Sequence, residues 1–202
     1  MALVSPNQEN LQKAFNKLIK WAQKNDLTIN DRKTVTMTFR KGGRLPKEDG
    51  IYMNERKLGS VNHFKYLGIT LQTSGECFSI HMRERATAAI TAISDIPYLN
   101  RLSLETVKEL FRIKIVPIVT YSLELTWEYL TKSDLHILEQ VKAVYWKRAL
   151  CVSKYTPSRL VYQMAREPFF IEELKCQMTL PSTPQSNAFL QSLKQKKMHF
   201  SM

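Results

Sequence analysis

Apolar residues near the start of the chain recur at the spacing of a helix. Four of them lie three or four positions apart, which predicts one buried helix face: Leu11, Phe15, Leu18 and Ala22. Ser5 and Pro6 predict the start of this helix, because serine caps helices and proline fits their first turn. Asn25 and Asp26 predict its end.

Residues 34–71 show the alternating pattern of β-strands. Threonines alternate with apolar residues at positions 34–39, which predicts a strand with one buried face. Asn54-Glu55 lies between two short apolar segments and predicts a hairpin turn. Residues 64–71 predict one further strand. Its faces are expected to carry Leu67, Ile69 and Leu71 on one side, and Tyr66, Gly68 and Thr70 on the other.

From residue 76 onward the apolar positions have a period near 3.6, which predicts helices. Pro97 is expected to stop the first helix, and Pro117 to kink or break the second. The four helices are expected near Met82, from Ser103, from the capping box Thr131-x-x-Asp134, and from Thr156-Pro157. The tryptophans on predicted helices are interpreted as core or hinge residues: Trp21, Trp127 and Trp146.

These patterns predict the fold class α+β. Residues 1–75 form a small antiparallel unit of one helix and strands, and residues 76–170 form an all-α helical block. Residues 171–202 are expected to be a polar, basic and disordered tail.

Charge changes the picture of possible partners. The 202 residues include 30 Lys and Arg against 18 Asp and Glu, a net charge of +12. This excess favours polyanionic partners, with nucleic acid first and an acidic membrane surface second. The sharpest basic cluster is interleaved with Gly42, Gly43 and Pro46, so it is expected to be a loop that is either merely solvated or contacts phosphates. Its cations are Arg40, Lys41, Arg44 and Lys47.

The remaining chemistry is sparse. The three cysteines are scattered, which favours a reducing compartment, and Cys77-x-x-x-His81 is the only close Cys/His pair, so no zinc site is expected. No apolar run approaches the roughly 20 residues of a membrane-spanning helix, and the N-terminus has no signal-peptide pattern. The chain is therefore expected to be soluble and intracellular, without a membrane partner.

Three segments, in this order, resemble a known family of polymerases. The first is the helix ending in Leu18-x-x-Trp21 with the string Leu27–Thr34, which contains Ile-Asn-x-x-Lys-Thr. The second is Val61–Leu71, which contains Phe-Lys-Tyr-Leu-Gly-Ile, and the third is the helical stretch 81–150. Together they resemble the fourth palm motif, the primer grip and the thumb of reverse transcriptases of non-LTR (LINE/jockey-like) retrotransposons.

The resemblance implies roles for six residues. Lys33 matches the palm-motif lysine that acts near the pyrophosphate leaving group. The primer-grip-like residues match the turn that holds the 3′ end of the primer: Phe64, Lys65, Tyr66, Leu67 and Gly68. The pattern alone fits a second interpretation, in which the aromatic residues of this strand are plain core.

The resemblance also implies what the chain lacks. Polymerases of this family hold Mg²⁺ with carboxylates that include an Asp-Asp pair, because two metal ions must neutralise the transferring phosphoryl group. The five aspartates of this chain all stand alone. We therefore expect a truncated palm and thumb fragment without autonomous polymerase activity and without a cofactor of its own.

Three functional hypotheses remain open. The first is a fragment that binds nucleic acid, either RNA or an RNA–DNA duplex of primer–template type. The second is a helical protein-interaction module, and the third is a non-functional relic of a mobile element. Loss of partner strands from the palm predicts an open sheet edge and self-association. Family analogy alone places the chain in the nucleus or the cytoplasm.

Overall fold

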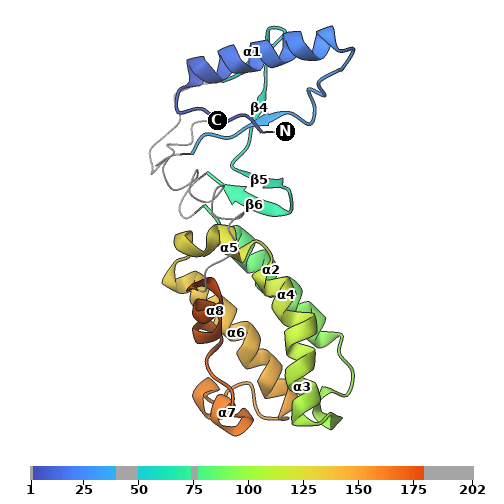
Figure 1. The fold of residues 1–202 in the computed structure, drawn as a ribbon, viewed down its shortest axis with the longest axis vertical. Coiled ribbons are helices and arrows are strands. Elements are labelled where there is room, and N and C mark those ends of the chain that lie inside the picture. Colours follow the sequence, from blue (N-terminus) through green and yellow to red (C-terminus); the bar gives the residue numbers. More distant parts are fainter. Residues whose placement is uncertain (1, 40–49, 74–76, 180–202) are drawn as a thin grey trace. The chain divides into compact units, whose positions relative to one another are not determined.

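The computed structural model describes residues 2–39, 50–73 and 77–179 (Figure 1). They divide into two compact units between Cys77 and Phe78, which we call the N-terminal unit and the helical unit. The helices are α1 (Gln8–Lys24), α2 (Ser79–Ser94), α3 (Leu104–Leu110), α4 (Val116–Thr120), α5 (Leu123–Thr126), α6 (Lys132–Ala149), α7 (Ser158–Ala165) and α8 (Phe170–Thr179). The strands are β1 (Val35–Thr36), β2 (Tyr52–Met53), β3 (Arg56–Lys57), β4 (Gly59–Ser60), β5 (His63–Tyr66) and β6 (Ile69–Gln72).

The N-terminal unit has a small core under α1. The predicted helix is present, but Asn7 caps it rather than Ser5: the Asn7 side chain accepts a hydrogen bond from the Glu9 backbone N–H at 2.8 Å. Ser5 instead bonds to Asn7 and lies outside the helix with Pro6. The buried residues of this core are Leu11, Phe15, Ile51 and Leu58.

Hydrogen bonds from one side chain join α1 to the first hairpin. The Gln12 amide nitrogen donates to the Tyr52 carbonyl, and the Tyr52 backbone N–H donates to the Gln12 amide oxygen, each at 2.8 Å. The side chain therefore pairs with β2 as a neighbouring strand does. The β2–β3 hairpin closes through Asn54 and Glu55, whose φ angles are +48° and +66°, as two-residue hairpin turns require.

The strands of the described residues pair in three two-stranded sheets. The β2–β3 and β5–β6 pairs are antiparallel, as predicted, whereas β1 and β4 are parallel, with Val35 opposite Gly59. The mixed α+β class is thus confirmed, and one of its sheets is not antiparallel. Residues 64–71 are a hairpin rather than the single strand predicted.

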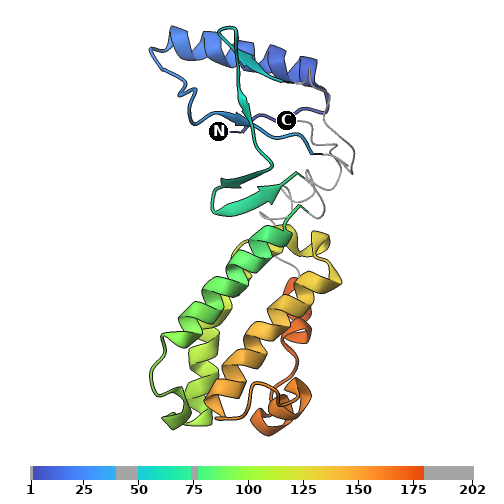
Figure 2. The same cartoon turned by 180° about the vertical axis from the view of Figure 1, so that it is seen from behind.

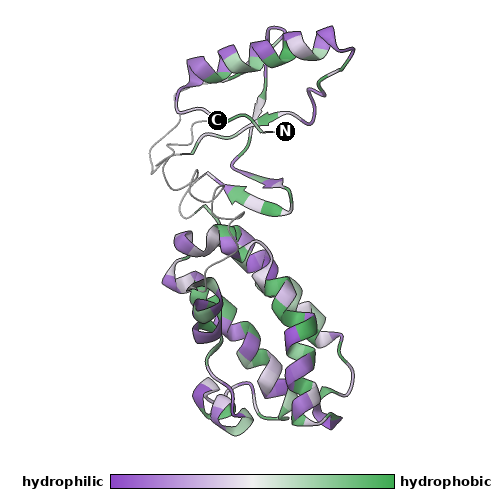
Figure 3. Cartoon of the chain, in the orientation of Figure 1, coloured by the Kyte–Doolittle hydropathy of each residue, from purple (hydrophilic) through white to green (hydrophobic). Residues whose placement is uncertain are grey.

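The helical unit packs α2 along α6 and α4, as the ribbon seen from behind shows (Figure 2). Hydrophobic and polar residues mix along the long helices (Figure 3). Most buried residues of α2 lie three or four positions apart, on one stripe, whereas α6 also buries the consecutive residues 141–143. Fully buried side chains from four segments meet in this core: Met82, Ile93, Ile115, Leu138, Tyr145, Trp146 and Leu174. No helix in the described part of the chain has the length and apolar character needed to cross a bilayer.

The predicted helix boundaries are largely confirmed. Ser103 caps α3, and Thr131 with Asp134 forms the expected capping box at the start of α6. Pro117 does not break the second helix. Instead a π-helical turn over Phe111–Ile115 leads directly into α4, and Pro117 lies in the first turn of α4, where its missing N–H leaves no bond unmade.

Two expectations are corrected. The tail predicted from residue 171 begins with a helix, because Phe170 and Leu174 lie four residues apart and both are buried. Residues 180–202 of that predicted tail lie outside the described residues. Trp21 is not a core residue, since 56% of its surface is exposed, whereas Trp146 is fully buried.

A fully buried lysine joins three segments of the helical unit. The Lys142 ammonium group donates to the Pro168 carbonyl at 3.0 Å, and lies 2.9 Å from one oxygen of Glu167 and 2.9 Å from one oxygen of Glu173. Nearby, the Glu139 carboxylate accepts hydrogen bonds from the Phe170 and Ile171 backbone N–H groups. These bonds hold the first turn of α8 against α6.

Tyr145 and Tyr162 are neutral hydrogen-bond donors inside this unit. The Tyr145 hydroxyl donates to the Val107 carbonyl at 2.6 Å, and the Tyr162 hydroxyl donates to the Glu139 carbonyl at 3.3 Å. Burial raises the pKa of both phenols well above the usual range, and the Glu139 carboxylate adds to the effect at Tyr162. Both hydroxyls therefore stay protonated throughout the ordinary pH range.

Lys142→Ala is expected to destabilise the helical unit by about 3–5 kcal/mol, because it leaves two carboxylates without their buried counter-charge. Urea unfolding, followed by tryptophan fluorescence, measures this change. Lys13→Ala is the control, since the Lys13–Glu9 ion pair is exposed and contributes less than about 1 kcal/mol. Equal stability of the two variants would contradict the role assigned to Lys142.

The N-terminal unit is expected to self-associate, because short two-stranded sheets leave backbone groups on their outer edges for another chain to pair with. Sedimentation velocity over a dilution series measures this. A dimer population that grows with protein concentration is the expected result. A monomer at every concentration contradicts the prediction.

Candidate nucleic-acid interface

The β5–β6 hairpin contains the five primer-grip-like residues. Phe64 pairs with Leu71, Lys65 with Thr70, and Tyr66 with Ile69. Residues opposite each other in a hairpin share a face, so Tyr66 lies on the same face as Ile69 and not on the opposite face as predicted. The structure thus brings the five residues together on one short hairpin.

Leu67 and Gly68 form the tip of this hairpin. Both have positive φ angles, +49° and +81°, which two-residue turns of this kind require. Gly68 adopts such angles without strain, but leucine is disfavoured there because its Cβ approaches the following carbonyl oxygen. The Leu67 side chain is nevertheless apolar and 76% exposed. Leu67 is thus an exposed leucine held in a disfavoured conformation at a hairpin tip.

The aromatic residues of the β5–β6 hairpin are not fully buried, as the interpretation of this segment as plain core would require. The Phe64 side chain is 36% exposed, Lys65 is exposed, and Tyr66 is half-buried. The core of the N-terminal unit is built from α1 and the segments near Ile51 and Leu58 instead. The hairpin therefore presents Phe64 and Tyr66 on one face and the Lys65 cation on the other, residue types that can contact bases, sugars and phosphates.

Lys33 lies in a tight turn that Asn30 organises. The Asn30 side-chain oxygen accepts hydrogen bonds from the Arg32 and Lys33 backbone N–H groups, at 3.0 and 3.2 Å. The Asn30 carbonyl accepts from the Thr34 hydroxyl at 2.7 Å. These bonds explain the Asn-x-x-Lys-Thr string as a turn in which asparagine and threonine fix the backbone. The Lys33 side chain is exposed.

The turn and the hairpin lie before and after one pair of strands. Lys33 precedes β1 by two residues, and the hairpin follows β4, the parallel partner of β1. The Arg56 guanidinium pairs with Asp31 at 2.9 Å, which ties the Lys33 turn to the β2–β3 hairpin rather than to β5–β6. The structure therefore places the two predicted contact points on separate elements and does not join them into one constellation.

The predicted basic loop of Arg40, Lys41, Arg44 and Lys47 lies outside the described residues. In the described part of the chain, no group of three or more His, Cys, Asp or Glu side chains is placed to hold a metal ion. Asp31 pairs with Arg56, and the Asp134 carboxylate accepts from the Thr131 backbone N–H in the capping box of α6, so these two carboxylates have structural partners. Exposed cations of the N-terminal unit such as Lys33 and Lys65 are suited to contacts with anions.

Two exposed tyrosines have a cation over the ring, and the sequence analysis did not identify them. The Arg101 guanidinium lies 4.8 Å from the centre of the Tyr98 ring, and the Lys154 ammonium lies 5.0 Å from that of Tyr155. The short spacings Tyr-x-x-Arg and Lys-Tyr were the available signal. Both pairs belong to the helical unit, and such surface pairs also suit stacking on bases.

Comparisons with protein-family models, with curated proteins and with solved structures found no match to this chain.

Leu67→Asn is expected to stabilise the β5–β6 hairpin by about 1 kcal/mol, because asparagine tolerates a positive φ and Asn-Gly favours this turn. Gly68→Ala is expected to destabilise it by about 1 kcal/mol. Amide hydrogen exchange of residues 63–72 measures both changes. Exchange rates that are the same in both variants would show that the turn is not formed as described.

Proposed function

We propose that this chain binds nucleic acid of primer–template type through the β5–β6 hairpin and the Lys33 turn, and that it adds no nucleotides on its own. The observation that carries the proposal is the hairpin tip, where Leu67 is exposed at a positive φ beside Lys65 and Phe64. A side chain held in this way gives a partner an apolar contact next to a phosphate-binding cation.

Charge supports the same conclusion. The described residues of the N-terminal unit include nine Lys and Arg against four Asp and Glu, whereas those of the longer helical unit include 14 against 11. Cations that neutralise phosphates release condensed counterions, which supplies most of the free energy of non-specific binding. The N-terminal unit is therefore the stronger candidate for contact with a nucleic-acid backbone.

The resemblance to non-LTR reverse transcriptases supports the type of nucleic acid. The resemblance implies that its primer-grip segment holds a primer end at a turn, and the Leu67-Gly68 turn of the β5–β6 hairpin is compatible with that role. Its palm lysine, Lys33, is exposed in a turn that Asn30 and Thr34 fix. The five isolated aspartates are the reason that we propose binding without polymerisation.

Binding is tested by fluorescence anisotropy on an RNA–DNA primer–template duplex and on single-stranded RNA, from low to near-physiological salt. We expect tighter binding to the duplex and an affinity that falls steeply with salt. Lys33→Ala and Lys65→Ala are each expected to reduce the slope of log K against log salt by about 1 unit, because each removes one phosphate contact.

Lys132→Ala is the matched control, since it removes one exposed cation from the start of α6 in the helical unit. A slope that falls equally in all three variants would mean that only net charge is measured. If the affinity and the salt slope are unchanged in Lys33→Ala and Lys65→Ala, the proposal is contradicted and a protein-interaction module is favoured. Incorporation of a labelled nucleotide by the purified chain would contradict the second part of the proposal.

A further inference from the structure

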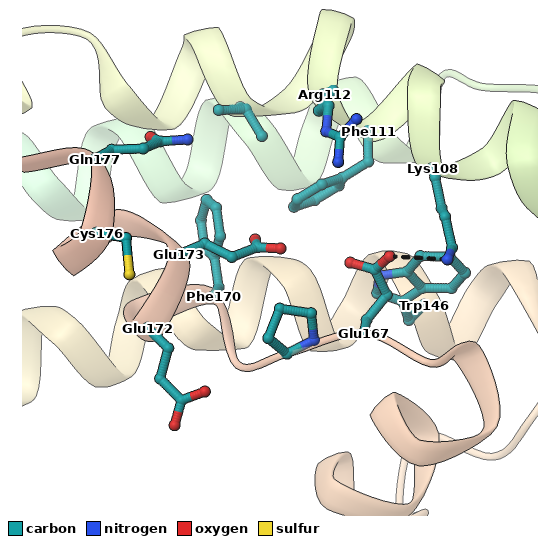
Figure 4. A pocket seen from close by; sticks show the side chains of 12 residues that line it. Lys108, Phe111, Arg112, Trp146, Glu167, Phe170, Glu172, Glu173, Cys176 and Gln177 are labelled. Atoms are coloured by element: carbon teal, nitrogen blue, oxygen red, sulfur yellow. Dashed lines mark ion pairs between the residues drawn. The ribbon is translucent and has the colours of Figure 1, made fainter. Parts of the chain in front are cut away.

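A pocket of about 540 Å³ lies in the helical unit, next to the ion pairs of Lys142 (Figure 4). It is formed by α3, the π-helical turn, α4, α6, the segment that leads into α8, and α8 itself. Pockets of this volume fit a small organic molecule. Its walls include the rings of Phe111 and Phe170, whose centres lie 5.5 Å apart with the rings edge to face.

Most of the charges at the pocket are paired. Glu167 contacts Lys108 at 3.4 Å and the buried Lys142 at 2.9 Å, and Glu173 contacts Lys142 at 2.9 Å. These two carboxylates and two ammonium groups balance, and the other charged lining residues, Arg112 and Glu172, are one cation and one anion. An ion that entered the pocket would be buried without a counter-charge, which costs several kcal/mol. The pocket therefore suits a neutral molecule.

One donor in the pocket wall has no acceptor. The Trp146 side chain is fully buried, and its indole N–H makes no hydrogen bond. Buried N–H groups are almost always satisfied, because an unmade bond costs the desolvation of the group. Figure 4 shows Trp146 in the wall beside Glu167 and Lys108, with its nitrogen on the edge toward the middle of the pocket.

The long Lys108–Glu167 contact makes this wall adjustable. Lys108 is partly exposed, and an ion pair at 3.4 Å between such groups contributes little to stability. The indole nitrogen has no exposed surface, so a molecule in the pocket reaches it only when a neighbouring wall side chain such as Lys108 moves aside. Glu167 keeps its 2.9 Å contact with Lys142 when this happens.

We propose that this pocket binds a neutral, flat, mainly apolar molecule whose carbonyl oxygen or ring nitrogen accepts a hydrogen bond from the Trp146 indole N–H. The aromatic walls supply the apolar contact, the balanced charges exclude ions, and the unpartnered donor sets the orientation. This site is independent of the proposed nucleic-acid interface, which belongs to the N-terminal unit.

Quinoline and naphthalene are the matched probes. They have the same shape, quinoline is neutral at pH 7, and only quinoline carries an acceptor. The full chain is labelled with ¹⁵N, and the indole signals of its three tryptophans are followed during titration up to the solubility limit of each probe. Trp146→Phe identifies the Trp146 signal.

We expect quinoline to move the Trp146 indole proton downfield and to bind about tenfold more tightly than naphthalene, as one added hydrogen bond allows. The signal of the exposed Trp21 stays in place. In Trp146→Phe the two probes bind equally. In Cys176→Trp, a change at an exposed residue of the rim, the larger side chain fills the pocket and neither probe moves the Trp146 signal.

Two results would overturn the proposal. The first is equal affinity of quinoline and naphthalene for the unmodified chain. The second is a Trp146 signal that neither probe moves. If Trp146→Phe does not fold, Cys176→Trp still tests the proposal. A shift of the Trp146 indole signal that quinoline still causes in this variant would come from binding outside the pocket and would contradict the proposal.

Discussion

Lys142 places an ammonium group where water does not reach it, and three protein oxygens take the place of the water. A buried charge that lost these partners would cost several kcal/mol, so the oxygens must stay in position whenever the unit is folded. They come from Glu167, Pro168 and Glu173, on the segment that follows α7 and on α8. The end of the described chain is thereby fixed on α6. The pocket exists because these segments are held there.

The interactions that stabilise the N-terminal unit are weaker. Its core is small, and the Gln12 amide contributes the edge pairing for β2 that a full sheet would supply by its backbone. Its hairpins are each two strands wide, and isolated pairs of strands are only marginally stable. Apolar side chains on the β5–β6 hairpin therefore remain partly exposed. A partner that covers these side chains would stabilise the hairpin, and burial of their apolar surface would contribute to the affinity of the complex.

Periodicity predicted most of the helical unit because apolar residues recur at helical spacing along its long helices. The same reasoning failed at residues 64–71, since alternation continues across a two-residue turn and only Gly68 signals that the chain reverses. It failed at α8 because this helix is short and only Phe170 and Leu174 of it are buried. Burial of Lys142 was not predictable either, because lysine is mostly exposed and its partners lie 25 and 31 residues away.

Only part of the candidate interface could be predicted from the sequence. Resemblance identified the hairpin residues and Lys33 before any geometry was known, and Asn30 then explained why that string forms a turn. No sequence signal indicated that Leu67 takes a positive φ, because leucine is disfavoured at that turn position, or that Trp146 lacks a hydrogen-bond partner, because this depends on how distant segments meet. Local patterns thus located the candidate contacts, and tertiary packing decided which of them are exposed.

The proposed contact between the β5–β6 hairpin and nucleic acid is best tested by hydrogen exchange. Exchange of the full chain is measured by mass spectrometry of peptides, with and without a saturating RNA–DNA primer–template duplex. We expect slower exchange in residues 63–72 and in the Lys33 turn, with α6 unchanged. Slower exchange confined to the helical unit, or none in residues 63–72 under saturating conditions, would contradict it.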